Sequence, residues 1–323
     1  MSSEKTAAPF PGCVDLAAAR VGGKTLSCSD DFFAPMANLL KPGRGVFIAD
    51  KFTPRGKWMD GWESRRKRAP GHDWCVLRLG LPGRLYGVDI DTNHFLGNHP
   101  PFASLDAAAG RNGPWTELLR KSPLKPGSQN LFTIRDRGLW SHLRLNIFPD
   151  GGVARLRAYG AAVLDRPRTG TIDLASVLNG GSVAACNDSF FGPKDNLIMP
   201  GRAKNMGDGW ETKRKRVPGH DWVVVRLGCP GRIETIEIDT NHFKGNFPDR
   251  ASLEGILSGH APGTPAKIPT GRWSLLLAPT PLKAHTRHFF SKELLAKGPF
   301  DYLRLRIYPD GGVSRLRAHG KPA

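Results

Sequence analysis

The stretch RIETIEIDTNHFKGN, from Arg232 to Asn246, alternates apolar and polar side chains and then becomes wholly polar before Phe243. A period of two is the pattern of a β-strand with one buried face. The stretch HDWVVVRLG, which begins at His220, alternates in the same way. In the first stretch, one face would carry Ile233, Thr235 and Glu237 and the other Glu234, Ile236 and Ile238. In the second stretch, one face would carry Trp222, Val224 and Arg226 and the other Val223, Val225 and Leu227. Both stretches therefore predict strands.

Composition agrees with an all-β protein. The 323 residues include 38 glycines and 27 prolines, which suit many short strands joined by turns. Apolar residues make up 39% and charged residues 24%, as in ordinary globular proteins. The five cysteines are odd in number and irregularly spaced, which does not predict a disulfide framework. The opening residues MSSEKTAAPFPG lack the apolar segment of a signal peptide. We expect a cytoplasmic protein with no membrane span.

Three polar strings occur twice in the chain. They are DGWESRRKRAPGHDW (60–74) with DGWETKRKRVPGHDW (208–222), DTNHFLGN (91–98) with DTNHFKGN (239–246), and HLRLNIFPDGGVARLRAYG (142–160) with YLRLRIYPDGGVSRLRAHG (302–320). The repetition predicts two copies of one β-sandwich domain. The expected parts are an N-terminal extension (1–12), an N-terminal repeat (13–160), a linker (161–170) and a C-terminal repeat (171–323).

The octads, Asp91–Asn98 and Asp239–Asn246, each follow an expected strand. Loops at strand ends are held by a rigid scaffold and commonly carry sites. A simple Asx turn would account for Asp91 or Asn93 alone. It does not account for His94 and Asn98 as well, nor for the return of the whole set in the second repeat. The octads therefore predict a functional loop.

The basic segment, residues 65–68 and its counterpart 213–216, lies between Trp-Glu and Pro-Gly-His-Asp-Trp. On a strand, Arg66 and Arg68 would share a face with Trp62, and guanidinium groups there could bind a carboxylate through two hydrogen bonds. A nucleic-acid patch, a localisation signal and a solvated strand face are the alternatives.

The His-Asp pairs at His72 and His220 could supply a base with its orienting acid, metal ligands or ordinary turn residues. Adjacent residues of a strand point to opposite faces, so the two members of a pair need not cooperate. No tight metal-ligand spacing is present, and we predict no metal site, with a divalent metal as the alternative. The sequence also lacks Gly-x-Ser-x-Gly, a Walker loop and a dinucleotide fingerprint.

Together, the repeated strings and the Pro-Asp-Gly-Gly turns resemble the allantoicase family from Val14 to Gly320. The resemblance implies two jelly-roll domains of the galactose-binding-like type. It also implies a hydrolase that converts allantoate and water to ureidoglycolate and urea in purine degradation, the pathway that breaks down allantoin. We expect that no cofactor is required, with a divalent metal as the alternative.

The polar residues of the motifs suit that chemistry. Arginines would bind the allantoate carboxylate, amides and carboxylates would bind its ureido groups, and titratable groups would move protons. The expected catalytic residues are His94, His242, Glu63, Glu211, His72 and His220. The expected substrate-binding residues are Arg66, Arg68, Arg214, Arg216, Asp91, Asn93, Asn98, Asp239, Asn241 and Asn246. Which residue is the acid, and whether each repeat works alone or one composite site forms, stays open at this level.

A formal charge of +18 suits capture of an anionic substrate. We expect allantoate as the ligand, no nucleic-acid partner, no membrane partner and a homo-oligomer. The alternative function is a non-catalytic sandwich module that binds an anionic or carbohydrate ligand. A nucleic-acid-binding protein is a third hypothesis, which rests on the charge and the basic segments.

Overall fold

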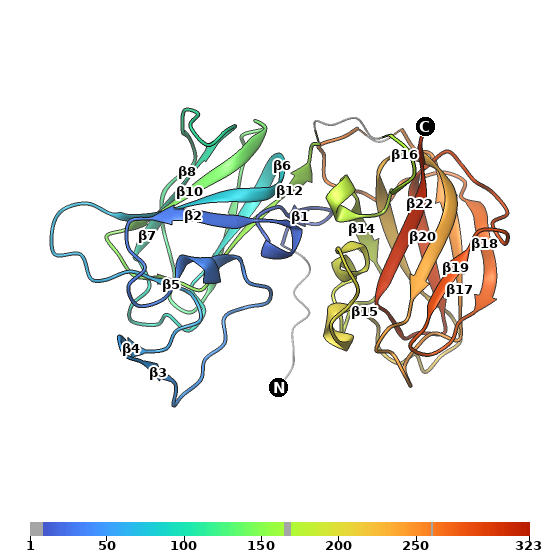
Figure 1. Cartoon of the computed structure of the whole chain (residues 1–323), viewed down its shortest axis with the longest axis horizontal. Helices are drawn as coiled ribbons and strands as arrows, with labels where there is room; N and C mark the ends of the chain where they lie inside the picture. The colour runs from blue at the N-terminus through green and yellow to red at the C-terminus, as the bar shows by residue number, and fades with distance from the viewer. Residues whose placement is uncertain (1–8, 165–168, 260) are drawn as a thin grey trace. The chain divides into compact units, whose positions relative to one another are not determined.

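The computed structural model describes residues 9–164, 169–259 and 261–323. Within these residues the chain forms two β-sandwiches of the same topology, each built on an eight-stranded sheet (Figure 1). The tandem all-β fold expected from the sequence is confirmed. The helical segments of the described chain are short 3₁₀ turns, and none is long or apolar enough to cross a membrane.

The strands of the N-terminal repeat alternate with only two 3₁₀ turns in the described chain. The elements are β1 (Val14–Asp15), η1 (Ala19–Val21), β2 (Lys24–Cys28), η2 (Met36–Leu40), β3 (Phe52–Thr53), β4 (Gly56–Lys57), β5 (Trp62–Glu63), β6 (Asp73–Asp91), β7 (Phe102–Ala108), β8 (Thr116–Pro123), β9 (Gln129–Thr133), β10 (Trp140–Phe148), β11 (Gly152–Val153) and β12 (Arg155–Ala162).

The C-terminal repeat has the same order. Its elements are β13 (Ile172–Asp173), η3 (Val177–Asn179), β14 (Ser182–Cys186), η4 (Lys194–Ile198), η5 (Met206–Asp208), β15 (Trp210–Glu211), β16 (Asp221–Asp239), β17 (Arg250–Ile256), β18 (Ser274–Pro281), β19 (Arg287–Phe290), β20 (Phe300–Tyr308), β21 (Gly312–Val313) and β22 (Arg315–Pro322). The hairpin β3–β4 has no counterpart among these elements.

The 19-residue strand β6 belongs to both layers of its sandwich. Its first half pairs with β2 and β10, where Leu77 lies opposite Thr25 and Leu143. Its second half pairs with β9 and β12 around Val88. Strand β16 does the same with β14 and β20, then with β19 and β22. The two stretches that predicted strands are therefore the halves of one strand, which passes from one layer to the other.

A β-bulge adjusts the alternation of β16. Strict alternation would place Ile233 on the face opposite Ile236 and Ile238. The register on β22 shifts between Ile233 and Thr235, and one extra residue there reverses the facing of the residues after it. All three isoleucines are consequently buried. Glu237 and Asp239 point to the other face of the sheet.

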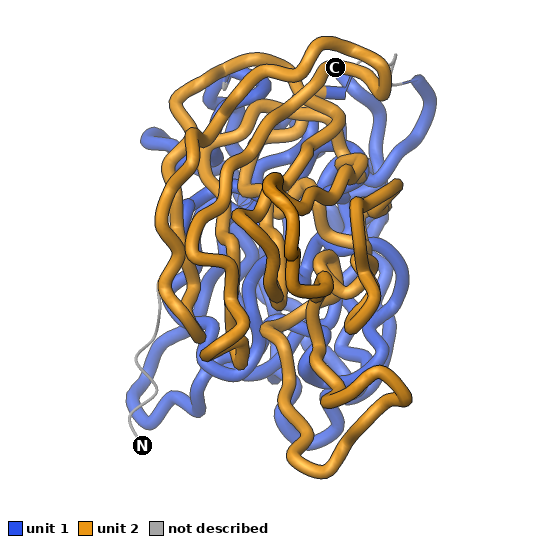
Figure 2. The backbone as a smooth tube through the Cα atoms, turned by 90° about the vertical axis from the view of Figure 1, so that its left-hand side faces the viewer, with its two compact units in different colours: residues 1–14, 164–323 blue, residues 15–163 orange. Residues whose placement is uncertain are grey.

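The chain divides into two compact units (Figure 2). Asp15–Val163 form one unit, and the described residues before Asp15 group with those after Val163. Gly12 accepts a hydrogen bond from the Ala266 amide at 3.0 Å, which fixes the end of the expected N-terminal extension to the C-terminal repeat. Residues 1–8 of that extension and residues 165–168 of the expected linker lie outside the described residues.

Candidate active site

Each octad is a tight turn that begins where the long strand ends. β6 ends at Asp91, and the Phe95 amide donates to the Thr92 carbonyl at 2.9 Å. His94 stands at the third position of this turn with φ 67°, and His242 has φ 70° in the C-terminal repeat. This left-handed region costs a side chain such as histidine about 1 kcal/mol, and glycine or asparagine usually occupies it. The histidine occupies this position in both repeats.

Phe95 joins the octad to the two other repeated motifs. Its ring is fully buried, and an added Cβ on Gly61 or Gly152 would come within 2.6 or 2.0 Å of it. The Gly152 amide also donates to the Asn98 carbonyl at 2.8 Å. The Asp-Gly-Trp-Glu string, the octad and the Pro-Asp-Gly-Gly turn therefore meet at one place, although they lie far apart in the sequence.

A carboxyl–amide pair stands at this meeting point. The Asn98 side-chain amide donates to Glu63 at 2.6 Å, and Asn246 donates to Glu211 in the same way. Burial raises the pKa of both glutamates above the ordinary value, and the hydrogen bond from the asparagine acts in the opposite direction. A carboxyl group with a raised pKa can hold a proton closer to neutral pH, as a general acid requires.

In the C-terminal repeat this pair lines a pocket of about 650 Å³. Arg214 is exposed at its wall, and the Lys215 ammonium lies 2.7 Å from the carboxylate of Asp221. The lining residues are Phe191, Glu211, Thr212, Arg214, Lys215, Gly245, Asn246, Phe247, Asp249, Leu282, Pro309, Asp310 and Gly311. The pocket thus brings together Glu211, Arg214 and Asn246 of the expected site, and it adds Lys215, which the sequence analysis did not select.

The basic segment does not continue the strand. β5 covers only Trp62 and Glu63, so the expected alternation of Arg66 and Arg68 with Trp62 is wrong. The chain turns away because the Lys67 amide donates to Asp150 at 2.8 Å. Arg66 and Arg68 are exposed, as are Arg214 and Arg216.

Of the alternatives for the His-Asp pairs, a base held by its neighbouring acid does not form at His72 and Asp73 in the described contacts. Asp73 instead accepts from Lys67 at 2.9 Å and from the Ser29 hydroxyl at 2.9 Å. The His72 ring lies against Phe148, with ring centres 4.7 Å apart. His72 precedes β6, which begins at Asp73, so the two residues belong to a loop and a strand respectively.

His220 occupies the matching place in the C-terminal repeat, with its ring centre 5.4 Å from that of Tyr308. Burial and then the neighbouring Arg306 lower the pKa of His220. The residues that line the 650 Å³ pocket include neither His220 nor His242.

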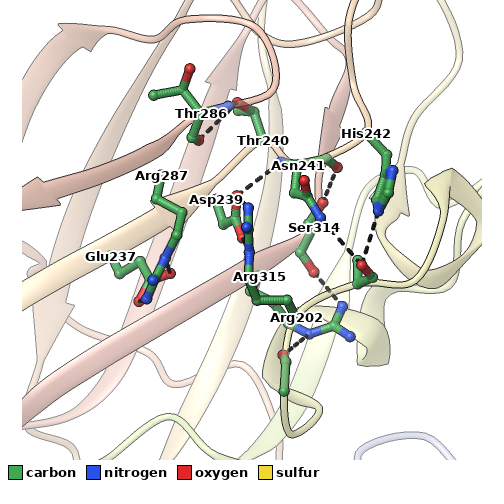
Figure 3. A network of polar contacts seen from close by, with 12 residues as sticks. Arg202, Glu237, Asp239, Thr240, Asn241, His242, Thr286, Arg287, Ser314 and Arg315 are labelled. Carbon is green, nitrogen blue, oxygen red and sulfur yellow. Dashed lines mark hydrogen bonds and ion pairs between the residues drawn. The ribbon is translucent and has the colours of Figure 1, made fainter.

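The first residues of each octad bond within the protein. Asp91 binds Arg44 through two hydrogen bonds of 2.8 and 2.7 Å and also accepts from the Asn93 amide, and the Asn93 side chain donates to the Gly45 carbonyl. In the C-terminal repeat the corresponding pairs are Asp239 with Arg202 and Asn241 with Ala203 (Figure 3). Sequence analysis did not select the two arginines, although Pro-Gly-Arg occurs at both places.

The histidines of the octads have partners other than the octad aspartates. His94 stacks with Phe47 at 5.7 Å between ring centres. His242 Nε2 lies 3.0 Å from the Ala203 carbonyl, and its amide donates to His285. Within the described residues, no hydrogen bond joins Asp91 to His94 or Asp239 to His242.

Metal-ligating side chains are dispersed. Among the described residues, no group of three or more His, Cys, Asp or Glu side chains is arranged to hold a metal ion.

Comparison with known proteins places this geometry in a family. The model of the allantoicase repeat matches residues 14–163 and again 172–323. The chain belongs to the allantoicase family. It is 49% identical to a probable allantoicase of Pseudomonas aeruginosa strain LESB58 over 98% of each chain, and 50% identical to one of Pseudomonas fluorescens strain Pf0-1, again over 98% of each.

Solved structures agree with the sequence relatives. A crystal structure of allantoicase from Saccharomyces cerevisiae is 35% identical, with a TM-score of 0.80 over 96% of this chain and 93% of that chain. A second allantoicase structure, also 35% identical, has a TM-score of 0.81 over 96% and 94%. The family resemblance of the motifs is thereby confirmed.

Proposed function

We propose that the protein is an allantoicase, which hydrolyses allantoate to ureidoglycolate and urea in purine degradation. Full-length similarity to named allantoicases supports the activity. The observation that carries the assignment of chemistry is the glutamate–asparagine pair, which forms in both repeats beside exposed arginines.

The reaction needs one proton donor and one proton acceptor. Allantoate carries a carboxylate and two ureido groups on one carbon. The bond between that carbon and one ureido nitrogen breaks, and the nitrogen takes a proton and leaves as urea. The oxygen of water bonds to the carbon and gives up a proton. A positioned acid or base typically contributes about 10²–10⁴-fold to such a step.

We assign the proton donor to Glu211, and to Glu63 in the N-terminal repeat. Burial favours the protonated carboxyl, which suits delivery of a proton to the leaving nitrogen. Asn246 and Asn98 hold these carboxyls in place and have amide hydrogens and oxygens that complement a ureido group. Arg214 and Arg66 would bind the substrate carboxylate as planar, permanently charged donors.

The test is release of urea from allantoate by the purified protein. Glu211→Gln and Glu63→Gln keep the hydrogen-bond acceptor for asparagine but cannot donate an acidic proton, so we expect turnover to fall by about 10²-fold or more with the fold intact. Glu234→Gln, at a solvent-facing position of β16, is the matched control and should keep wild-type turnover. Wild-type turnover in the double variant Glu63→Gln/Glu211→Gln would exclude the assignment.

The single variants also decide how many sites work. If only one of the two single variants loses turnover, a single repeat is active. If each single variant loses about half of the turnover, the two repeats carry independent sites. If either single variant alone loses nearly all turnover, the two repeats form a coupled site. No urea release by the wild-type protein, with or without added divalent metal, would favour the binding-module alternative.

Three expectations accompany this function. We propose that no metal is required, which the same assay in the presence of a chelator measures. We propose a homo-oligomer, which sedimentation measures. We propose a cytoplasmic location and no nucleic-acid partner, so that DNA binding near physiological salt should be weaker than micromolar.

A further inference from the structure

A second pocket lies on the outer face of the C-terminal sheet. Its volume is about 270 Å³, and it shares no residue with the pocket around Glu211. Its lining side chains come from β13, β16, β19 and β22 and from the loop that carries Arg202. The lining residues are Asp173, Gly201, Arg202, Glu237, Asp239, Arg287, Arg315, Arg317 and His319.

Two buried carboxylates hold two exposed guanidinium groups at this pocket (Figure 3). Glu237 accepts from Nε and Nη2 of Arg287 at 2.7 and 2.9 Å. Asp239, fully buried, accepts from Nε and Nη2 of Arg202 at 3.2 and 3.4 Å. The side chains of Arg287 and Arg202 remain 44% and 52% exposed. Asp239 also lies opposite Arg287 in the ladder between β16 and β19, so both guanidiniums stand over the same pair of acids.

Each of these guanidiniums has donors left over. A guanidinium has five N–H groups, and the carboxylate engages only the Nε and Nη2 side. Within the described residues, the Nη1 group of Arg202 and of Arg287 has no hydrogen-bond partner. Because the buried acids already fix both arginines, a ligand would not have to order them on binding. Arg315 and Arg317 are largely buried and bind Asp208 and Asp173, although the buried Nη1 group of Arg317 has no hydrogen-bond partner in the described part of the chain. The two exposed guanidiniums are therefore what a ligand meets first.

The N-terminal repeat has only one of the two exposed guanidiniums. Gln129 stands opposite Asp91 in the ladder, where Arg287 stands opposite Asp239, and it donates to Asp89 at 2.7 Å. Arg44 and Asp91 keep the other pair. The second guanidinium is therefore particular to the C-terminal repeat.

We propose that this pocket of the C-terminal repeat binds a small dianion, such as inorganic phosphate or a short dicarboxylate. The lining has four arginines and three acids, so it remains net positive although Arg202 and Arg287 are paired. Their free Nη1 groups can donate to two anionic oxygens, and hydrogen bonds from arginine to such oxygens are among the stronger ones in proteins. The proposal does not depend on the assignment of Glu211, because the two pockets have no residue in common.

The test is titration of the intact protein with inorganic phosphate, and separately with malonate, at constant ionic strength, monitored by calorimetry. The double variant Glu237→Asp/Arg287→Gln copies the Asp89–Gln129 pair of the N-terminal repeat, which keeps the buried acid partnered. We expect it to bind at least about tenfold more weakly than the wild type. The converse variant Asp89→Glu/Gln129→Arg should raise the stoichiometry from one anion to two.

Two further variants separate this site from the other pocket and from a folding defect. Glu211→Gln should bind the anion as the wild type does, and loss of binding there would locate the anion at the Glu211 pocket and overturn the proposal. Arg287→Lys keeps a positive charge beside Glu237 but loses the paired N–H donors of the guanidinium. This variant should therefore have the melting temperature of the wild type and bind the anion more weakly. Undiminished binding in Arg287→Lys and the double variant, or no binding by the wild type at millimolar anion, would also overturn it.

Discussion

A methyl group on Gly152 would come within 2.0 Å of the ring of Phe95, and one on Gly312 would come equally close to the ring of Phe243. The ring fills the space where a side chain would stand. A Cβ added to Gly61 or Gly209 would likewise come within 2.6 or 2.7 Å of the same rings. The phenylalanine of each octad therefore requires glycine in both the Asp-Gly-Trp-Glu string and the Pro-Asp-Gly-Gly turn.

Gly152→Ala should destabilise the N-terminal repeat by about 1–3 kcal/mol, because the buried ring and its surroundings must move to admit the methyl group. Gly97→Ala is the matched control, since an added Cβ there meets no atom within 4 Å. Urea denaturation of both variants measures the difference. Equal urea midpoints for Gly152→Ala and Gly97→Ala would show that the Phe95 ring moves at no measurable cost in stability.

His94→Gly and His242→Gly should separate stability from activity. Glycine adopts the positive φ of this position without the cost that histidine bears, so the free energy of unfolding should stay the same or rise slightly. If the imidazole takes part in proton transfer or substrate binding, the double variant should lose about 10²-fold or more in turnover. Full turnover would assign the histidines to the turn alone.

Asp89→Asn should change how stability depends on pH. Burial raises the pKa of Asp89 from 3.8 to about 6. The folded protein therefore binds this proton more tightly than the unfolded chain, and the contribution to stability is complete below about pH 3.8 and lost as the pH rises through 6. Relative to Asp89→Asn, the wild type should lose about 2–3 kcal/mol between about pH 4 and 7.

Thermal unfolding of the wild type and Asp89→Asn across this range measures the effect. Asp50→Asn, at an exposed position, is the control for loss of one negative charge. Parallel curves for the wild type and Asp89→Asn would contradict the raised pKa.

His288→Asn should be tolerated, because Asn130 performs the same task in the other repeat. His288 accepts from the Lys283 amide at 2.8 Å and lies 3.0 Å from the Ile238 carbonyl, and Asn130 accepts from the Lys125 amide and donates to the Ile90 carbonyl at 2.8 and 3.0 Å. His288→Ala removes both hydrogen bonds and should cost about 1–3 kcal/mol. Similar melting temperatures for the Asn and Ala variants would refute this.

The periodicity of the sequence was sufficient for the fold class, and the repeated strings were sufficient for the duplication, but neither determined the strand boundaries. Alternation identified the two halves of β16 as two stretches of strand, whereas the structure joins them in one strand of 19 residues. The bulge beside Thr235 could not be predicted either, because it depends on pairing with β22. Registers between strands far apart in sequence are set by tertiary packing rather than by local pattern.

For the candidate site, the sequence identified the loops that carry its residues more accurately than the hydrogen-bond and ion-pair partners of those residues. Glu211 and Asn246 were selected separately, and only the fold shows that they bond to each other. Asp239 was assigned to substrate, but Arg202 occupies its carboxylate. That arginine lies 37 residues earlier in the chain, and a single sequence carries no signal for so distant an ion pair.

Strand β6 contributes hydrogen bonds to both layers of its sandwich through one unbroken backbone. Neither layer can detach while the other keeps its register, because both registers are fixed on the same 19 residues. Backbone amides at Leu77 and at Val88, in opposite layers, should therefore show the same free energy of opening by deuterium exchange under conditions where exchange reports global opening. Each repeat should melt as a single cooperative unit rather than by the peeling of an outer sheet.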